Sequence, residues 1–358
     1  MDALSAALTA LVARHESLRT TFDAVDGRGV QIVHDPREIR LDPYDLSHLP
    51  ADEREAELRE LLAYERARPF DLRRGPLLRT GLIRLGAQEH VLSLTLHHII
   101  TDGWSTGVLT GDLRELYRAA LSGEPAALPP LPVSYADFAA WQRTELTAPR
   151  ADEELAYWTR QLAGVPPLEV PTDRPRPAVR TKNGATVEFT VPAGVNSRLK
   201  EFGQTRGTTL FMTLVAAAQI LLARLSGGRD IAVGTVTSGR ERPEVERLIG
   251  FFVNTLVLRS TVDPHARFDD FLAEVRGTVL DAFAHQAVPF ERVVDEVRPV
   301  RDTSRTPLFQ AMVVLQNAPG RALELPGLEL ADVELDTQTA AFDLTFEFAE
   351  AEGVCCAD

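Results

Sequence analysis

The sequence has 358 residues, of which 44% are hydrophobic and 25% charged, and its net charge is −14. This length accommodates about two domains at roughly 100–200 residues each, and the acidic balance argues against a nucleic-acid-binding surface. No apolar run reaches the roughly 18–20 residues that a membrane span needs, and the first residues lead us to expect no secretory leader. The two cysteines, Cys355 and Cys356, are adjacent and offer neither a disulfide framework nor a zinc site. We therefore expect a cytoplasmic protein without nucleic-acid or membrane partners.

Helices and strands alternate in the first half of the chain. Apolar residues at helical spacing predict helices over residues 3–16, 58–64, 109–121, 135–141 and 153–162. Runs rich in apolar and β-branched residues predict strands over residues 30–33, 77–83 and 91–100.

A proline-dense stretch follows at residues 166–182, and we interpret it as a linker. Beyond it, helices are expected over residues 209–225 and 268–283, and strands over 185–191, 231–236, 251–258, 309–315 and 344–348. The mixture predicts an α/β or α+β protein with two lobes, at residues 1–165 and 183–358.

The most distinctive segment carries two adjacent histidines at the end of the predicted strand 91–100. From His97 to Ser105 it reads H-H-I-I-T-D-G-W-S. Because side chains alternate along a strand, His97 and His98 are expected to face opposite ways, with His98 on the face of Leu96. At most one of them enters a given cavity, so the pair is a poor metal chelate and we expect no metal site.

A second motif overlaps the first. Residues 103–107 read G-W-S-T-G, which fits the G-x-S-x-G elbow of serine hydrolases with Ser105 as nucleophile. His265 or His285 could complete a triad. The elbow needs its serine directly after a strand, whereas residues 97–103 intervene here, so we keep the hydrolase only as an alternative.

The H-H-x-x-x-D-G pattern resembles the core motif of condensation domains in nonribosomal peptide synthetases. Five other segments resemble that family's motifs in order: R-H-E-S-L-R-T-T-F from Arg14, Y-A-D-F-A-A-W from Tyr135, I-G-F-F-V-N-T from Ile249, H-Q-A-V-P-F-E from His285 and R-D-T-S-R-T-P-L-F-Q from Arg301. The family's opening S-x-A-Q-x-R-L-W segment is missing, and the family continues beyond Phe348. The resemblance therefore implies a condensation domain that is truncated at both ends.

The resemblance implies two chloramphenicol-acetyltransferase-like lobes in a V, with a tunnel at their junction. It implies peptide-bond formation between substrates carried on the phosphopantetheine arms of donor and acceptor peptidyl carrier domains, next to an adenylation domain. No cofactor bound by the domain itself is expected. The motifs from Arg14 and His97 are most similar to those of the subgroup that joins an L-configured donor to an L-configured acceptor.

The resemblance also assigns a catalytic set: His98, Asp102, Gly103 and His97. His98 leads it, either as a base toward the attacking amine or as a hydrogen-bond partner that orients it, and His97 is expected to serve structure. Asp102 is expected to be structural, pairing with Arg14 or Arg19. Gly103 allows close backbone approach at a helix start whose N–H groups can polarise an oxyanion.

Three more residues are interpreted as site elements. Trp104 is expected either to line the tunnel or to pack in the core. Asn254 is expected either to reach the substrate or to cap a turn, and Trp141 to anchor packing. Carrier domains are usually acidic, so their docking is expected to use local arginines, namely Arg66, Arg68, Arg73 and Arg74.

Two further alternatives stay open. The chain could be a non-catalytic recruitment module of the same fold, although the intact motif disfavours this. It could also belong to another branch of the superfamily. However, heterocyclising domains replace the two histidines with acids, and epimerising domains lack the continuation Gly103-Trp104-Ser105.

Overall fold

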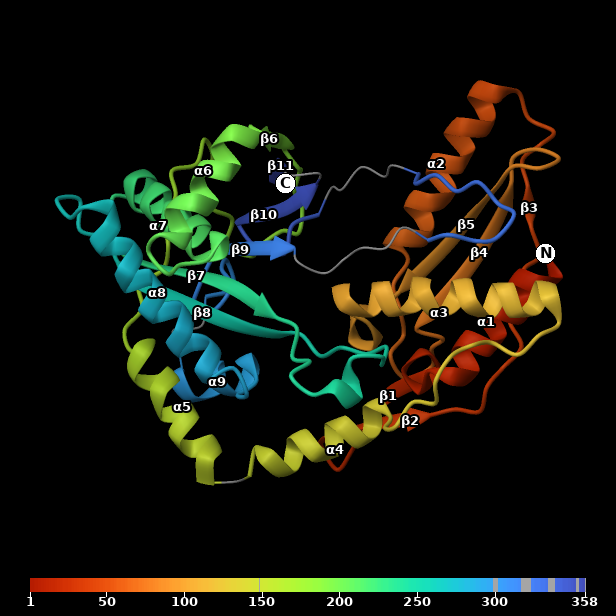
Figure 1. Cartoon of the computed structure of the whole chain (residues 1–358), viewed down its shortest axis with the longest axis horizontal. Coiled ribbons are helices and arrows are strands. Elements are labelled where there is room, and N and C mark those ends of the chain that lie inside the picture. The colour runs from red at the N-terminus through yellow and green to blue at the C-terminus, as the bar shows by residue number, and fades with distance from the viewer. Residues whose placement is uncertain (148, 299–301, 317–322, 334–338, 352–353, 358) are drawn as a thin grey trace. The chain divides into compact units, whose positions relative to one another are not determined.

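The computed structural model describes residues 1–147, 149–298, 302–316, 323–333, 339–351 and 354–357 (Figure 1). In this part of the chain no helix is long and apolar enough to span a membrane. The chain divides into two compact units. The first holds Met1–Arg143, Arg240–Phe252 and Ala318–Leu335, and the second holds Thr144–Gly239, Val253–Asn317 and Asp336–Asp358.

This division differs from the expected lobes at residues 1–165 and 183–358, because the two units interleave along the chain. The segment Arg240–Phe252 comes late in the sequence but packs in the first unit. The predicted linker 166–182 is part of the second unit, where Leu168 is buried and its N–H donates to Gln310 Oε1 at 2.6 Å. The prolines led to the prediction of a linker. However, the stretch belongs to the second unit because Leu168 is buried there.

The first unit contains a three-stranded sheet and a separate hairpin. The sheet has the order β3 (Tyr44–Asp45), β4 (Leu78–Arg84) and β5 (His90–Leu96), and the antiparallel hairpin pairs β1 (Thr20–Val25) with β2 (Arg28–Val33). The helices of this unit are α1 (Asp2–Arg14), α2 (Ala51–Ala67), α3 (Gly103–Ser122) and α4 (Tyr135–Glu145), which ends just past the unit's boundary, with 3-10 turns η1 (Glu16–Arg19), η2 (His98–Ile100) and η3 (Pro243–Val245).

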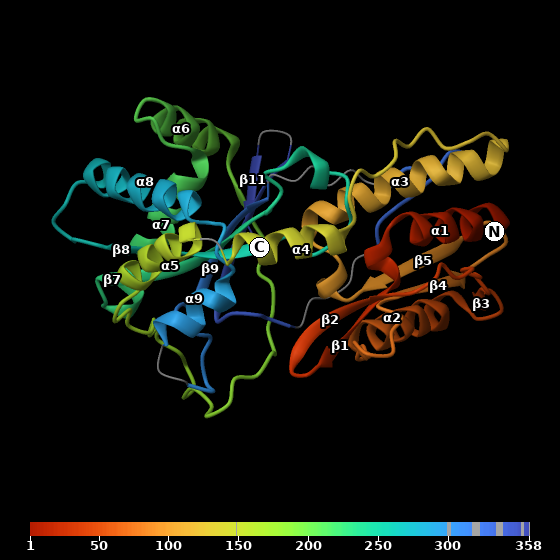
Figure 2. The ribbon, with the colours of Figure 1, turned by 90° about the horizontal axis from the view of Figure 1, so that it is seen from below.

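Residues of β4 alternate between the two faces of this sheet, as a strand requires. Leu78 and Leu82 join a buried cluster with α1 and α3, whereas Ile83 joins a second cluster with α2. Figure 2 shows α1 and α3 on one side of the strands and α2 on the other. The sheet therefore carries α3, and with it the histidine-containing turn before α3, on its more apolar face.

The second unit is built on a six-stranded sheet. Its strand order is β6 (Phe189–Val191), β11 (Val354–Ala357), β10 (Leu344–Ala351), β9 (Ala311–Gln316), β7 (Asp230–Thr237) and β8 (Asn254–Thr261). The helices are α5 (Pro149–Gln161), α6 (Ala193–Gln204), α7 (Leu210–Ser226), α8 (Phe268–Ala284) and α9 (Phe290–Val297).

The core of the second unit is formed mainly by α7 and α8 against the central strands. Nine residues of α7 are buried, and Thr209 caps this helix by accepting the N–H of Met212 at 3.3 Å. Trp158 of α5 is 1% exposed in the same core and donates its indole N–H to His285 O at 2.9 Å.

Most predicted elements are confirmed, but three predicted strands extend three or four residues beyond the observed ones. The strand expected at 91–100 ends at Leu96, the one expected at 251–258 begins at Asn254, and the one expected at 185–191 covers only Phe189–Val191. At the first two places, apolar residues leave the sheet to pack in turns. Arg301 of the last motif lies outside the described residues.

Candidate active site

The two histidines lie in a turn, because β5 ends one residue before them. His97 caps the 3-10 turn His98–Ile100, and its Nδ1 accepts the backbone N–H of Ile99 at 3.0 Å. The His97 ring is half-buried and meets the Phe70 ring edge-on at 5.7 Å. Burial, and then the neighbouring His98 charge, lower the pKa of His97. These contacts fit the structural role expected for His97.

His98 is exposed, and its imidazole meets the Phe251 ring edge-on, with centroids 5.3 Å apart and planes at 87°. The two histidine rings thus contact different aromatic rings, so they point to different places, as predicted. The rings diverge because the two histidines lie at a turn. The prediction instead assumed that side chains alternate along a strand. Of the two histidines, His98 is the exposed one.

Asp102 is buried, with 2% of its surface exposed, and its carboxylate is surrounded by donors. Oδ1 accepts the N–H of Ser105 at 2.8 Å, which caps α3, and Oδ2 accepts the N–H of Phe252 at 3.0 Å. Nη2 of Arg240 lies 3.1 Å from Oδ1 and 3.3 Å from Oδ2. Burial lowers the pKa of Arg240, an effect that the Asp102 charge opposes.

The structural role predicted for Asp102 fits this geometry, but the predicted partners were wrong. Arg14 instead binds Asp112 at 2.8 Å, and Arg19 donates to His34 O at 2.5 Å. The arginine that pairs with Asp102 is instead Arg240, which is 138 positions away in sequence. A partner so distant in sequence is brought in by tertiary folding, which the motif cannot indicate.

Ser105 does not have the environment of a hydrolase nucleophile. It is 0% exposed, its Oγ donates to Gly250 O at 2.9 Å, and it accepts from Gly250 N at 3.1 Å and from Arg240 Nη2 at 2.7 Å. An exposed oxygen beside a histidine base is what the serine hydrolase mechanism requires. The geometry therefore assigns Ser105 to holding the segment Arg240–Phe252.

Gly103 begins α3 and is exposed, and a Cβ added to it would meet nothing within 4 Å. Among the hydrogen bonds of the described residues, none is donated by the N–H of Gly103 or of Trp104. Trp104 is 38% exposed and donates its indole N–H to Glu246 O at 2.9 Å, so it is not a core residue. The start of α3 thus presents two free N–H groups next to the histidine turn.

Asn254 and Trp141 both contact other residues of the protein. The Asn254 amide donates to Gln286 O and Val288 O, each at 2.8 Å, and its Oδ1 accepts the N–H of Phe290 at 3.0 Å. Every polar atom of this side chain is therefore used by the loop before α9, which is the turn-capping alternative. Trp141 lies against Phe138 and under the Arg242 guanidinium.

Sequence reasoning missed Arg240, Phe251 and the role of Tyr135. The Tyr135 hydroxyl donates to Phe251 O at 2.6 Å, and burial, with the Asp102 charge as a second cause, raises the pKa of Tyr135 to about 12. Tyr135 and Phe251 both fall inside the family motifs, so they were visible as pattern positions without an assigned role. Arg240 fell outside every motif.

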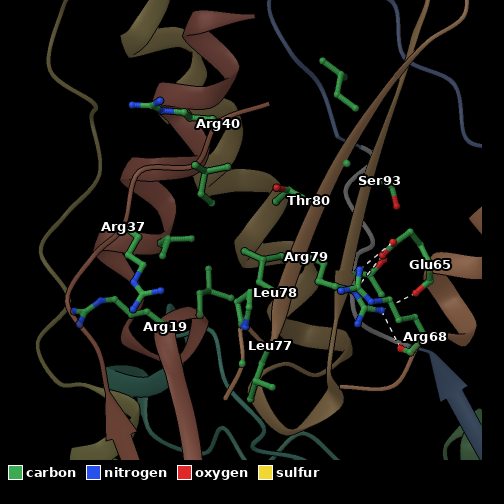
Figure 3. Close-up of a pocket in the computed structure, with 18 of the residues that line it drawn as sticks. Arg19, Arg37, Arg40, Glu65, Arg68, Leu77, Leu78, Arg79, Thr80 and Ser93 are labelled. Atoms are coloured by element: carbon green, nitrogen blue, oxygen red, sulfur yellow. Dashed lines mark hydrogen bonds and ion pairs between the residues drawn. The ribbon is translucent and has the colours of Figure 1, made fainter. Parts of the chain in front are cut away.

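A cavity of about 790 Å³ lies elsewhere in the first unit, between α2 and strands β4 and β5. Figure 3 shows Arg79 and Arg68 beside Glu65 on one side of it, and Arg19 near Arg37 on the other. Its lining includes neither of the two motif histidines nor Asp102. We therefore place the candidate active site at the histidine turn rather than in this cavity.

Comparison with known proteins identifies the family. Residues 1–356 match the condensation domain family, and the chain belongs to it. It is similar to a subunit of the linear gramicidin synthase of Brevibacillus parabrevis, with 49% identity over 96% of this chain and 7% of that protein. It is also similar to the phosphinothricin tripeptide synthetase PhsC of Streptomyces viridochromogenes, with 46% identity over 98% of this chain and 32% of that protein. The chain thus spans less than a third of the length of either relative.

Among solved structures, the X-domain from teicoplanin biosynthesis has 30% identity and a TM-score of 0.89, over 99% of this chain and 80% of that one. It has also been solved in a complex with OxyB. The likeness confirms the mixed α/β class with chloramphenicol-acetyltransferase-like lobes. Condensation domains of nonribosomal peptide synthetases form peptide bonds, so the predicted amide-forming transferase is confirmed at the level of the family.

Proposed function

We propose that this chain joins a donor acyl or peptidyl thioester to the amino group of an acceptor aminoacyl thioester, with His98 acting on the attacking amine. The observation that carries this proposal is the placement of the His98 imidazole. It is exposed at a turn where the side chains of His97 and Asp102 accept hydrogen bonds from the backbone. The expected tunnel and V-shaped arrangement stay predictions.

The reaction forms one bond and breaks one bond. The acceptor nitrogen attacks the thioester carbon, the C–N bond forms, the C–S bond breaks, and the leaving sulfur takes up the proton that the nitrogen loses. A thioester is already activated, so positioning supplies much of the rate. His98 either takes the proton from nitrogen or accepts a hydrogen bond that orients the amine.

Two further groups fit the developing charge. The free N–H groups of Gly103 and Trp104 at the start of α3 suit the oxygen of the tetrahedral intermediate, because a helix N-terminus stabilises negative charge. The Asp102 carboxylate is neutralised by Arg240, and its remaining hydrogen bonds come from backbone N–H groups. Its charge is therefore already compensated within the protein.

Both substrates would arrive on phosphopantetheine arms of donor and acceptor carrier domains, supplied by neighbouring modules that include an adenylation domain, in the cytoplasm. Membership in the condensation family supports this assignment, since the relatives are peptide synthetases much longer than this chain. The arms belong to the carriers, so the domain itself would bind no cofactor.

The test is transfer between two loaded carriers. The chain is mixed with an acyl-loaded donor carrier and an aminoacyl-loaded acceptor carrier, and the product on each carrier is followed by mass spectrometry. We expect an amide on the acceptor carrier and an emptied donor arm. Omitting the chain, or acetylating the acceptor amine, should abolish the product.

The alternatives give different results in the same experiment. A serine hydrolase would release free acid from the donor and react with a fluorophosphonate probe at Ser105, which its burial should prevent. A recruitment module would bind a protein but yield no amide. This role is compatible with the X-domain, which has been solved in a complex with OxyB. Free acid with labelled Ser105, or binding without an amide, would overturn the proposal.

A further inference from the structure

The segment Arg240–Phe252 holds one side chain against the candidate catalytic histidine, and that side chain is Phe251. The neighbours Ile249 and Phe252 are 2% and 5% exposed, whereas Phe251 is 37% exposed. Its ring is the aromatic group that meets His98, edge-on at 5.3 Å. Phe251 is thus the residue of this stretch that leaves the core and lies against the exposed histidine.

The backbone on both sides of Phe251 is fixed by hydrogen bonds. Ser105 Oγ binds both Gly250 O and Gly250 N, Tyr135 Oη donates to Phe251 O, and Asp102 Oδ2 accepts the Phe252 N–H. Each distance lies between 2.6 and 3.1 Å. The main chain at Phe251 is thus tied to Asp102 and Ser105 at the start of α3 and to Tyr135 at the start of α4.

Position 250, next to Phe251, requires glycine because the backbone there lies against the Tyr135 ring. A Cβ on Gly250 would lie 2.3 Å from Cδ2 of Tyr135, so any other residue would push this backbone off the Tyr135 ring. The close approach is what lets Tyr135 reach the Phe251 carbonyl. The backbone of the segment is therefore held in one position, and from it the Phe251 side chain reaches the His98 ring.

The Phe251 ring matters because an exposed imidazole such as that of His98 can rotate about its χ2 torsion. The χ2 torsion of histidine has broad, roughly two-fold preferences, so an unconfined ring aims its nitrogens over a wide range of directions. An edge-on aromatic neighbour favours one orientation over the others. We propose that Phe251 is a positioning residue for the condensation reaction: it fixes the plane of the His98 imidazole and so aims its nitrogen at the acceptor amine.

This inference rests on the proposed function and deepens it. A group that only supports folding would change stability, whereas a group that aims His98 changes the chemical step and does so only when His98 is present. Binding of the carriers would be little affected. The two roles therefore predict different changes in kcat, in KM and in the response of a His98 variant.

The experiment uses the two-carrier transfer assay with Phe251→Ala, Phe251→Leu, Phe251→Tyr and the matched control Phe268→Ala, whose ring is also 37% exposed but lies in the other unit. We expect Phe251→Ala to lower kcat about tenfold, a part of the roughly 10²–10⁴-fold that a positioned proton-transfer group supplies. KM should change less than about threefold. Phe251→Tyr should keep nearly full activity, Phe251→Leu should fall between, and the control should match the wild type.

Two readouts separate positioning from folding. Phe251→Ala placed on His98→Ala should cause no further loss, because the group it aims is gone. In proton NMR spectra, the ring protons of His98 should shift in Phe251→Ala and stay near their wild-type positions in Phe251→Tyr.

A wild-type kcat in Phe251→Ala, equal losses with and without His98, or leucine as active as tyrosine would each overturn the inference while leaving the proposed function intact. If Phe251→Ala does not fold, the comparison of leucine with tyrosine decides. An inactive wild type would overturn the proposed function, and this inference with it.

Discussion

At the scale of single residues, the Asp102 carboxylate receives three kinds of donor: the capping N–H of Ser105, the N–H of Phe252 and the Arg240 guanidinium. Its side chain is 0% exposed and that of Arg240 is 1% exposed. A buried pair of this kind contributes little relative to an apolar pair, but removing one partner leaves a charge without compensation. The residue that looks most like a catalytic acid in the motif is therefore better explained as a structural one.

Replacing Asp102 by asparagine should destabilise the first unit by about 3–5 kcal/mol, because Arg240 would stay buried and unpaired. Urea unfolding followed by circular dichroism measures the change. The control is Glu38→Gln, which breaks the exposed pair with Arg40 at 2.9 Å and should change stability by less than about 0.5 kcal/mol.

The double variant Asp102→Asn with Arg240→Met should cost less than the sum of the two single changes, since it removes both charges together. A stable, folded but inactive Asp102→Asn protein would contradict the structural role. It would favour a direct chemical role for the carboxylate.

At the scale of elements, periodicity predicted the long helices and central strands because each buries a regular face. The helix expected at 209–225 is α7, and the strand expected at 231–236 is β7, each within one residue at either end. Boundaries failed where apolar residues leave an element. Ile99 and Ile100 continue the apolar pattern of β5 but form a 3-10 turn, and Phe251 and Phe252 precede β8 without joining it.

The candidate site was predictable only in part, for a physical reason. The motif contained His98, Asp102 and Gly103 because they are close in sequence. Their tertiary contacts are with Arg240, which binds Asp102, and with Phe251, which meets His98 and is itself bound by Tyr135. A sequence motif indicates the local geometry of residues that are close in the chain. A partner more than a hundred residues away has no characteristic spacing that a motif could reveal.

At the scale of the whole molecule, the net charge of −14 would repel an acidic carrier domain unless docking uses a local basic surface. The four predicted docking arginines lie close together in sequence in the first unit. Arg68, Arg73 and Arg74 have side chains that are 51%, 71% and 89% exposed, although each has an acidic neighbour. Arg68 and Arg74 also line the large cavity (Figure 3).

Replacing Arg66, Arg68, Arg73 and Arg74 with glutamine should weaken binding of at least one carrier about tenfold, and the loss should shrink as salt rises because exposed charges are screened. Isothermal titration at two ionic strengths measures it. The matched control replaces four exposed arginines of the second unit, Arg198, Arg224, Arg229 and Arg276, and gives the same net charge. Equal affinities in the two variants would rule out a specific role for the first set.

The central claim is that His98 acts in amide formation, and its most direct test is the rate of transfer by His98→Ala between loaded carriers. We predict a kcat at least about 100-fold below wild type, as expected for loss of a proton-transfer group, with an unchanged unfolding midpoint. His90→Ala, which removes an exposed histidine at the start of β5, should transfer at the wild-type rate. Near-normal transfer by folded His98→Ala would contradict the claim.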